Sequence, residues 1–60
     1  MDIQLNGQPH ALPEQSTIAT LLQREGLAER RVAIEVNGEI IPRGQHAQHV
    51  LLPGDRVEIV

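Results

Sequence analysis

The chain has 60 residues and a formal net charge of −3, which fits one small acidic domain. A domain of this size buries only about 60% of the surface that its unfolded chain exposes, so it has little room for a deep catalytic cavity. Small size therefore favours a carrier, adaptor or binding module, and we predict that the protein is not an enzyme.

Aromatic residues are absent, and the five basic residues are scattered arginines. Nucleic-acid-binding proteins use basic patches to contact phosphates and aromatic side chains to stack on bases. We therefore expect no nucleic acid among the partners. The core has to be built from Ile, Leu, Val and Ala, which suits one helix packed on one sheet.

Cysteine is also absent, which excludes disulfides and thiolate zinc sites and suits a reducing compartment. Polar residues follow Met1 directly, and the apolar runs are far shorter than the roughly 20 residues of a membrane-spanning helix. These features predict a cytoplasmic protein with no signal peptide and no membrane partner.

The first residues predict a β-hairpin. Residues 2–6 alternate polar and apolar side chains, as in a half-buried strand. Asn6-Gly7 follows, and this pair favours a two-residue turn because both positions tolerate a positive φ. Residues 8–12 form the returning strand, and Pro9 predicts an edge position or an outward orientation because it has no N–H to donate.

A short helix is predicted over residues 18–25. The apolar residues at helical spacing are Ile18, Leu21 and Leu22. Thr17 is the expected N-cap, with Ser16 as the alternative. Gly26 is expected to end the helix in the left-handed conformation, and Leu27 to pack back on the last turn.

The second half of the chain predicts short strands. Residues 32–36 alternate cleanly, Asn37-Gly38 repeats the turn signal, and residues 39–41 form a strand closed by Pro42.

Residues 43–49 are polar and irregular, with one loose turn at most, and residues 50–52 are a brief apolar piece. A Pro-Gly-Asp turn then leads into the last strand, residues 56–60, in which Val57 and Ile59 face the same way.

This order of elements predicts an α+β protein with one helix on one face of a mixed sheet of four to five strands. The connection through the helix is long enough for a crossover, and a ferredoxin-like sandwich is disfavoured because it needs two helices. The order matches the β-grasp, or ubiquitin-like, fold, whose last strand lies mid-sheet beside the first. We predict a single β-grasp domain over residues 1–60.

Two segments resemble a known family. Residues 36–43 read Val-Asn-Gly-Glu-Ile-Ile-Pro-Arg, and residues 47–60 include Leu-Leu-Pro-Gly-Asp-Arg-Val-Glu-Ile-Val. Both are similar to ThiS proteins, the sulfur carriers of thiamine biosynthesis, as are residues 1–7 and the helix after Thr17. The first segment is the more specific, since other β-grasp families share Gly-Asp-x-Val-Glu-Ile. Turn formation alone also accounts for the Asn and Gly residues of both segments.

The resemblance implies a cosubstrate without catalytic residues, cofactor or metal. ThiS proteins end in a flexible Gly-Gly extension. An E1-like adenylating enzyme activates its carboxylate with ATP, sulfur replaces AMP to give a thiocarboxylate, and thiazole synthase takes the sulfur. Both enzymes are the implied partners. Without Cys, sulfur would have to be carried on the main-chain terminus.

The sequence departs from this pattern at Val60, after which no Gly-Gly follows. We expect the sulfur attachment site on a Gly-Gly tail beyond Val60. Without that tail we predict an inactive chain, because the carboxylate of a β-branched residue held in a strand is a poor substrate for adenylation.

A partner surface is predicted on the uncovered sheet face. Its residues are Ile40, Ile41, Arg43 and Val60, of which one or both isoleucines would be exposed. Arg43 is expected to project from the sheet edge and to pair with an acidic group of a partner, or with Glu39 or Asp55 in this chain.

The histidines give no metal site. His46 and His49 lie three residues apart, but no third ligand is near them in the sequence, so we predict surface histidines. The carboxylates have no evident pocket that would adapt them to acid–base catalysis.

Two other functions remain open from the sequence. One is a regulatory or ligand-binding module of the TGS type, which shares the Val-Asn-Gly and Gly-Asp-x-Val-Glu-Ile features. The other is a sulfur carrier like the small subunit of molybdopterin synthase, which usually lacks the Pro-Arg run at 42–43.

Overall fold

The computed structural model describes all 60 residues, and its elements follow the predicted order. The strands are β1 (Asp2–Leu5), β2 (Gln8–Ala11), β3 (Ile34–Val36), β4 (Glu39–Ile40) and β5 (Arg56–Ile59). The helix α1 spans Ile18–Arg24, and a 3₁₀ turn, η1, spans Arg43–Gln45.

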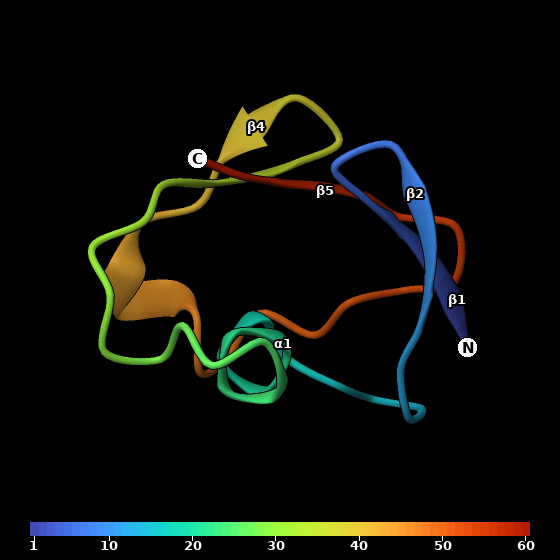
Figure 1. Ribbon diagram of the computed structural model, residues 1–60, viewed down its shortest axis with the longest axis horizontal. Coiled ribbons are helices and arrows are strands. Elements are labelled where there is room, and N and C mark those ends of the chain that lie inside the picture. The colour runs from blue at the N-terminus through green and yellow to red at the C-terminus, as the bar shows by residue number, and fades with distance from the viewer.

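The five strands form one mixed sheet in the order β2-β1-β5-β3-β4 (Figure 1). β5 runs parallel to β1 and antiparallel to β3, so the last strand lies mid-sheet beside the first. This arrangement, with one helix, is the predicted α+β β-grasp fold. β2 is an edge strand, so Pro9 occupies the position where a missing N–H is tolerated.

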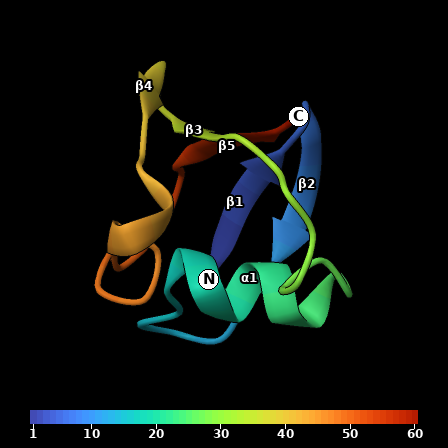
Figure 2. The ribbon, with the colours of Figure 1, turned by 90° about the vertical axis from the view of Figure 1, so that its left-hand side faces the viewer.

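Helix α1 lies across one face of the sheet, and the opposite face carries no further element (Figure 2). The core between helix and sheet is entirely aliphatic. Its ten buried residues are Ile3, Leu12, Ile18, Leu21, Leu22, Ile34, Val36, Ile41, Leu51 and Val57. Burial of each such side chain favours folding by about 1.5–3 kcal/mol, which opposes the loss of chain entropy.

The N-terminus of α1 is satisfied by groups from two segments. Thr17 is the N-cap, and its Oγ1 accepts from the Thr20 N–H at 3.1 Å, as predicted. The N–H groups of Ile18 and Ala19, which have no acceptor within the helix, donate to the carbonyls of His49 and His46, both at 3.1 Å. Because the helix needs these acceptors, the irregular segment after η1 is fixed against its first turn.

The helix ends as the sequence predicted. Gly26 has φ +74°, and the Leu27 N–H donates to the Leu22 carbonyl at 2.7 Å. A residue without Cβ adopts this left-handed conformation at little cost, so the chain can turn back toward the core. Leu27 then packs against the core as a partly buried residue.

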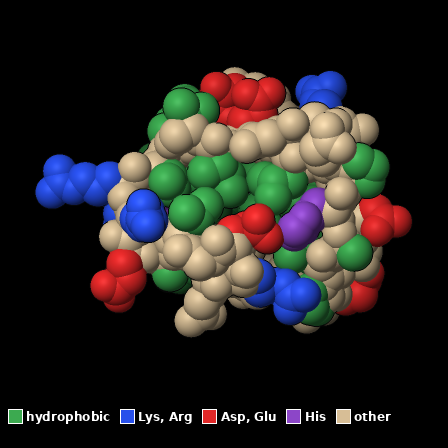
Figure 3. Space-filling view, viewed as in Figure 1, with side chains coloured by type: hydrophobic (Ala, Val, Ile, Leu, Met, Phe, Trp, Pro, Cys, Tyr) green, Lys and Arg blue, Asp and Glu red, His purple; other side chains and the backbone are tan.

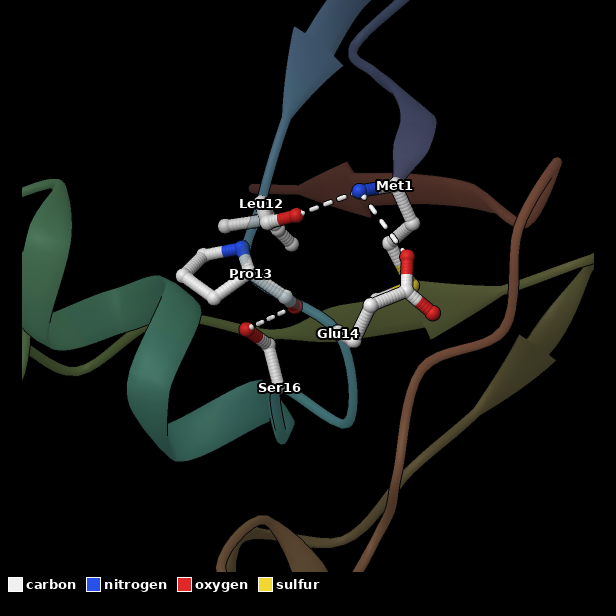
Figure 4. Close-up of polar contacts among 5 residues, drawn as sticks. All are labelled: Met1, Leu12, Pro13, Glu14 and Ser16. Carbon is white, nitrogen blue, oxygen red and sulfur yellow. Dashed lines mark hydrogen bonds and ion pairs between the residues drawn. The ribbon is translucent and has the colours of Figure 1, made fainter.

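The loop before α1 is tied to the start of β1 (Figure 4). The Met1 ammonium donates to the Leu12 carbonyl at 2.7 Å and lies 3.2 Å from Glu14 Oε2. The Ser16 hydroxyl donates to the Pro13 carbonyl at 2.7 Å. Ser16 is buried, so its hydroxyl stabilises the loop.

All five strands are shorter than predicted, and β1, β2 and β4 each end one residue before the predicted bound. The strand predicted over 32–36 begins at Ile34, and the one predicted over 56–60 ends at Ile59. Ala33 and Val60 nevertheless exchange two hydrogen bonds of 3.0 Å, so the pairing of β3 with β5 continues past the strand ends.

Candidate functional site

The carboxyl end of β5 is held from two sides. On one side, Ala33 exchanges its two backbone hydrogen bonds with Val60. On the other side, Asn6 Oδ1 accepts from the Ile59 N–H at 2.8 Å. The Val60 side chain itself is 82% exposed. The backbone is therefore fixed through β5 and as far as Val60, while the Val60 side chain stands in solvent.

The uncovered sheet face can be assigned from the strand register. Glu35 pairs with Glu58 across β3 and β5, and with Ile40 across β4. Side chains directly opposite each other in a pair lie on the same face, and alternate residues along a strand return to it. Ile40, which is 60% exposed, and Val60 therefore lie on the same face as the two carboxylates, Ile40 beside Glu35 and Val60 two residues after Glu58.

The sequence alone did not predict that Glu35 and Glu58 face each other on this surface. The alternation of residues 56–60 places Glu58 opposite in direction to Val57, but register alone decides which residue of β3 it meets. Like charges directly opposite each other destabilise a sheet. The pair makes the centre of this face acidic.

The prediction of Ile41 as a surface residue is wrong. Ile41 is 6% exposed and belongs to the core. Its N–H donates to the Ile34 carbonyl at 2.9 Å, which sets Ile41 opposite a core residue of β3. Two adjacent isoleucines in a short strand must face opposite ways, and the register sends Ile40 outward.

Arg43 lies apart from this face, and its predicted pairing with Glu39 or Asp55 is wrong. Its guanidinium donates to the Arg30 carbonyl at 3.3 Å and approaches the Ala28 carbonyl at 3.5 Å. Arg43 begins η1, which turns the chain away from β4 toward the segment after α1. Of the four predicted surface residues, the structure thus places Ile40 and Val60 on the same face.

The histidines occupy three different environments. His46 is 7% exposed, so its prediction as a surface residue is wrong, and its Nε2 lies 3.0 Å from the Ile41 carbonyl oxygen. His10 Nε2 lies 3.3 Å from Glu25 Oε2. His49 is half-buried. No three metal-ligating side chains gather anywhere in the chain.

No helix in this protein is both long enough and apolar enough to cross a bilayer.

Comparison with known proteins now gives the family. Residues 3–60 match the ThiS family. The chain belongs to the ThiS family. The match covers the hairpin, the helix and both ends of β5, so it includes every element of the candidate site. It favours the prediction of a ThiS-type sulfur carrier over a TGS-type module and over a sulfur carrier of the molybdopterin-synthase type.

Solved ThiS structures have the same fold. The chain is similar to the crystal structure of the thiamine biosynthesis protein ThiS from Geobacter metallireducens, with a TM-score of 0.90 and 28% identity over 100% of this chain and 91% of that one. The solution structure of a thiamine biosynthesis protein from the same organism gives a TM-score of 0.84, again with 28% identity and 100% of this chain, and covers 81% of that chain.

Two curated relatives are much longer than this ThiS-family chain. They are thiazole synthases from Magnetococcus marinus, 38% identical over 60 residues, and Paramagnetospirillum magneticum, 37% identical over 60 residues. The alignments cover 100% of this chain but 18% of each relative. The similarity thus concerns a segment of those enzymes, of the size of one β-grasp domain.

Proposed function

We propose that this chain is a sulfur carrier for the formation of the thiazole of thiamine. The observation that carries the proposal is the match to the ThiS family over residues 3–60, which includes the mid-sheet strand β5 and the exposed Val60 directly after it. A carrier of this kind needs a stable body and an accessible chain end. The aliphatic core supplies the first, and an extension attached after the exposed Val60 would supply the second.

In this proposal the sulfur is held as a thiocarboxylate on a Gly-Gly end attached after Val60. The five glycines of the chain stand singly, so none of them provides that end. An E1-like enzyme joins the terminal carboxylate to AMP and releases pyrophosphate from ATP. Sulfide then attacks the acyl carbon, AMP leaves, and the thiocarboxylate remains.

The proposed partners are this adenylating enzyme and thiazole synthase. The similarity to segments of two thiazole synthases supports the second, because a carrier fused to its acceptor enzyme needs no separate encounter. The chain acts as a cosubstrate and not as an enzyme, and the proposed location is the cytoplasm. Ile40 and Val60 are the proposed contacts on the sheet face, together with Glu35 and Glu58.

Intact mass measurement tests the proposal. The chain extended by a short linker and Gly-Gly is incubated with ATP, sulfide and a ThiS-adenylating enzyme. We expect a mass gain equal to the exchange of one oxygen for one sulfur. The unextended chain and a variant ending in Gly-Val are the matched controls, and both should keep their mass. If the Gly-Gly form keeps its mass while the enzyme modifies its own carrier, the proposal fails.

A further inference from the structure

A second candidate site lies on the side of the molecule framed by α1, the segment after it and η1. These three elements surround a cavity of about 200 Å³. Figure 2 looks onto this side, with α1 below and η1 at the left. The cavity does not include Ile40, Glu35, Glu58 or Val60, so it is separate from the uncovered sheet face.

The lining of the cavity is largely aliphatic. Ala19 and Leu22 come from α1, and Ala28 and Val32 from the segment that follows the helix. Small side chains at three of the lining positions, Ala47 included, leave the depression open. The Arg43 guanidinium holds the backbone of residues 28–30 through its contacts to two carbonyls, which keeps the wall in place.

The rim of the cavity is basic in a protein that is acidic overall. Arg30 and Arg43 both line it, and no Asp or Glu does. The two ion pairs of the molecule, Met1–Glu14 and His10–Glu25, involve neither arginine. In Figure 3, arginine side chains stand at the left, where the segment after α1 and η1 lie in Figure 1.

The size of the cavity indicates its occupant. Sites that enclose small molecules and cofactors span roughly 300–1,000 Å³, whereas this one measures about 200 Å³. It suits a single aliphatic side chain, the kind of anchor that fills a pocket at a protein–protein interface. The uncompensated guanidinium groups at the rim complement carboxylates beside that anchor.

We infer that this cavity is a docking site for a partner protein, which inserts one aliphatic side chain flanked by acidic residues. The partner contacts Arg30 and Arg43 together with the aliphatic part of the lining. Val32 precedes Ala33, which pairs with Val60, so the docked partner lies on the side next to the end of β5. The inference does not depend on sulfur transfer and is tested without it.

An NMR titration of the ¹⁵N-labelled chain tests this docking site. The probe is the peptide acetyl-Asp-Leu-Glu-amide. We expect saturable shifts of the amides of Ala19, Ala28, Val32 and Ala47, with none on the outer sheet face. The peptides acetyl-Asp-Ser-Glu-amide and acetyl-Lys-Leu-Lys-amide remove the anchor and reverse the charge, and both should bind much more weakly.

Two variants separate the contributions. Arg30→Gln removes one rim charge and should raise the dissociation constant about two- to fivefold, as for an exposed charge pair. Arg56→Gln makes the same charge change on the outer sheet face and should leave it unchanged. Ala47→Glu places a carboxylate at the cavity and should abolish the shifts.

Three results would overturn the inference. One is the absence of saturable shifts with the acidic peptide. Another is equal binding of all three peptides, which would mean nonspecific adsorption. The third is a set of concentration-dependent shifts around the cavity without peptide, which would mean that a second copy of the chain occupies it.

Discussion

The two Asn-Gly turns have nearly the same backbone but hold opposite ends of β5. Asn6 and Gly7 have φ +50° and +82°, and Asn37 and Gly38 have φ +53° and +86°. In each turn the Asn side chain reaches past its own hairpin to β5. Asn37 Oδ1 accepts from the Arg56 N–H at 2.9 Å, and Asn6 Oδ1 accepts from the Ile59 N–H at 2.8 Å.

The difference lies in the second hydrogen bond of each amide. Asn37 Nδ2 donates to Asp55 Oδ1 at 3.0 Å, and the other carboxylate oxygen of Asp55 accepts from the Leu52 N–H at 2.9 Å. Asn6 Nδ2 makes only a long contact of 3.4 Å to the Ile59 carbonyl. The Asn37 side chain therefore joins the start of β5 to a network, whereas the Asn6 side chain gives its end one good bond beside the two backbone bonds of Val60 with Ala33.

Replacement of Asn37 should have the largest effect. Asn37→Ala removes the network and places alanine, which adopts the left-handed region less readily than asparagine, at φ +53°. We expect a loss of about 2–3 kcal/mol in the free energy of unfolding. Asn37→Gly keeps the turn and should lose only about 1 kcal/mol. Urea unfolding of both variants measures the difference, and equal losses would contradict the role of the positive φ.

Asn6→Ala should cost less, about 1–2 kcal/mol, because the strain is the same but only one strong bond is lost. The matched variant Asn6→Gly isolates that bond. In native-state hydrogen exchange it should speed exchange of the Ile59 amide, whose acceptor is gone, and leave the Arg56 amide unchanged. Faster exchange at both amides would mean that the two turns do not act on separate ends of the strand.

Asp55→Ala should cost about 1 kcal/mol, because it removes the acceptor of the Leu52 N–H and of the Asn37 amide. The informative measurement is a pair of double-mutant cycles. Asp55→Ala combined with Asn37→Gly should be less destabilising than the sum of the single changes. Combined with Asn6→Gly it should be additive, and non-additivity there would show that the ends of β5 are coupled.

Glu58→Lys should have the smallest effect, a gain of about 0.2–1 kcal/mol, because it turns a facing pair of like charges into an opposite-charge pair. The gain should shrink as salt is added. Glu29→Lys makes the same change in net charge at an exposed position without an ion pair. If both variants change the free energy of unfolding equally, the effect comes from net charge and not from the pairing of Glu58 with Glu35.

The sequence carried enough information for the order of elements, because local signals agree with the fold. Thr17 caps the helix, Gly26 ends it, and both Asn-Gly pairs turn as predicted. The mid-sheet position of the last strand followed from that order.

Contacts between distant residues escaped prediction. Period-two alternation could not decide between Ile40 and Ile41, since only the register with β3 sets which one faces inward. His46 was expected at the surface, but its carbonyl accepts from the free Ala19 N–H at the start of the helix, which holds this residue against the helix. The reach of Asn6 to Ile59 spans 53 residues, and nothing local in the sequence indicates it.

Amide hydrogen exchange tests most directly whether a fixed strand presents a free chain end. It is measured on the chain extended by a linker and Gly-Gly. We predict protection of the Ile59 and Val60 amides, whose acceptors are Asn6 Oδ1 and the Ala33 carbonyl, and unprotected exchange at every residue after Val60. Protection of the added glycines, or free exchange at Val60, would contradict it.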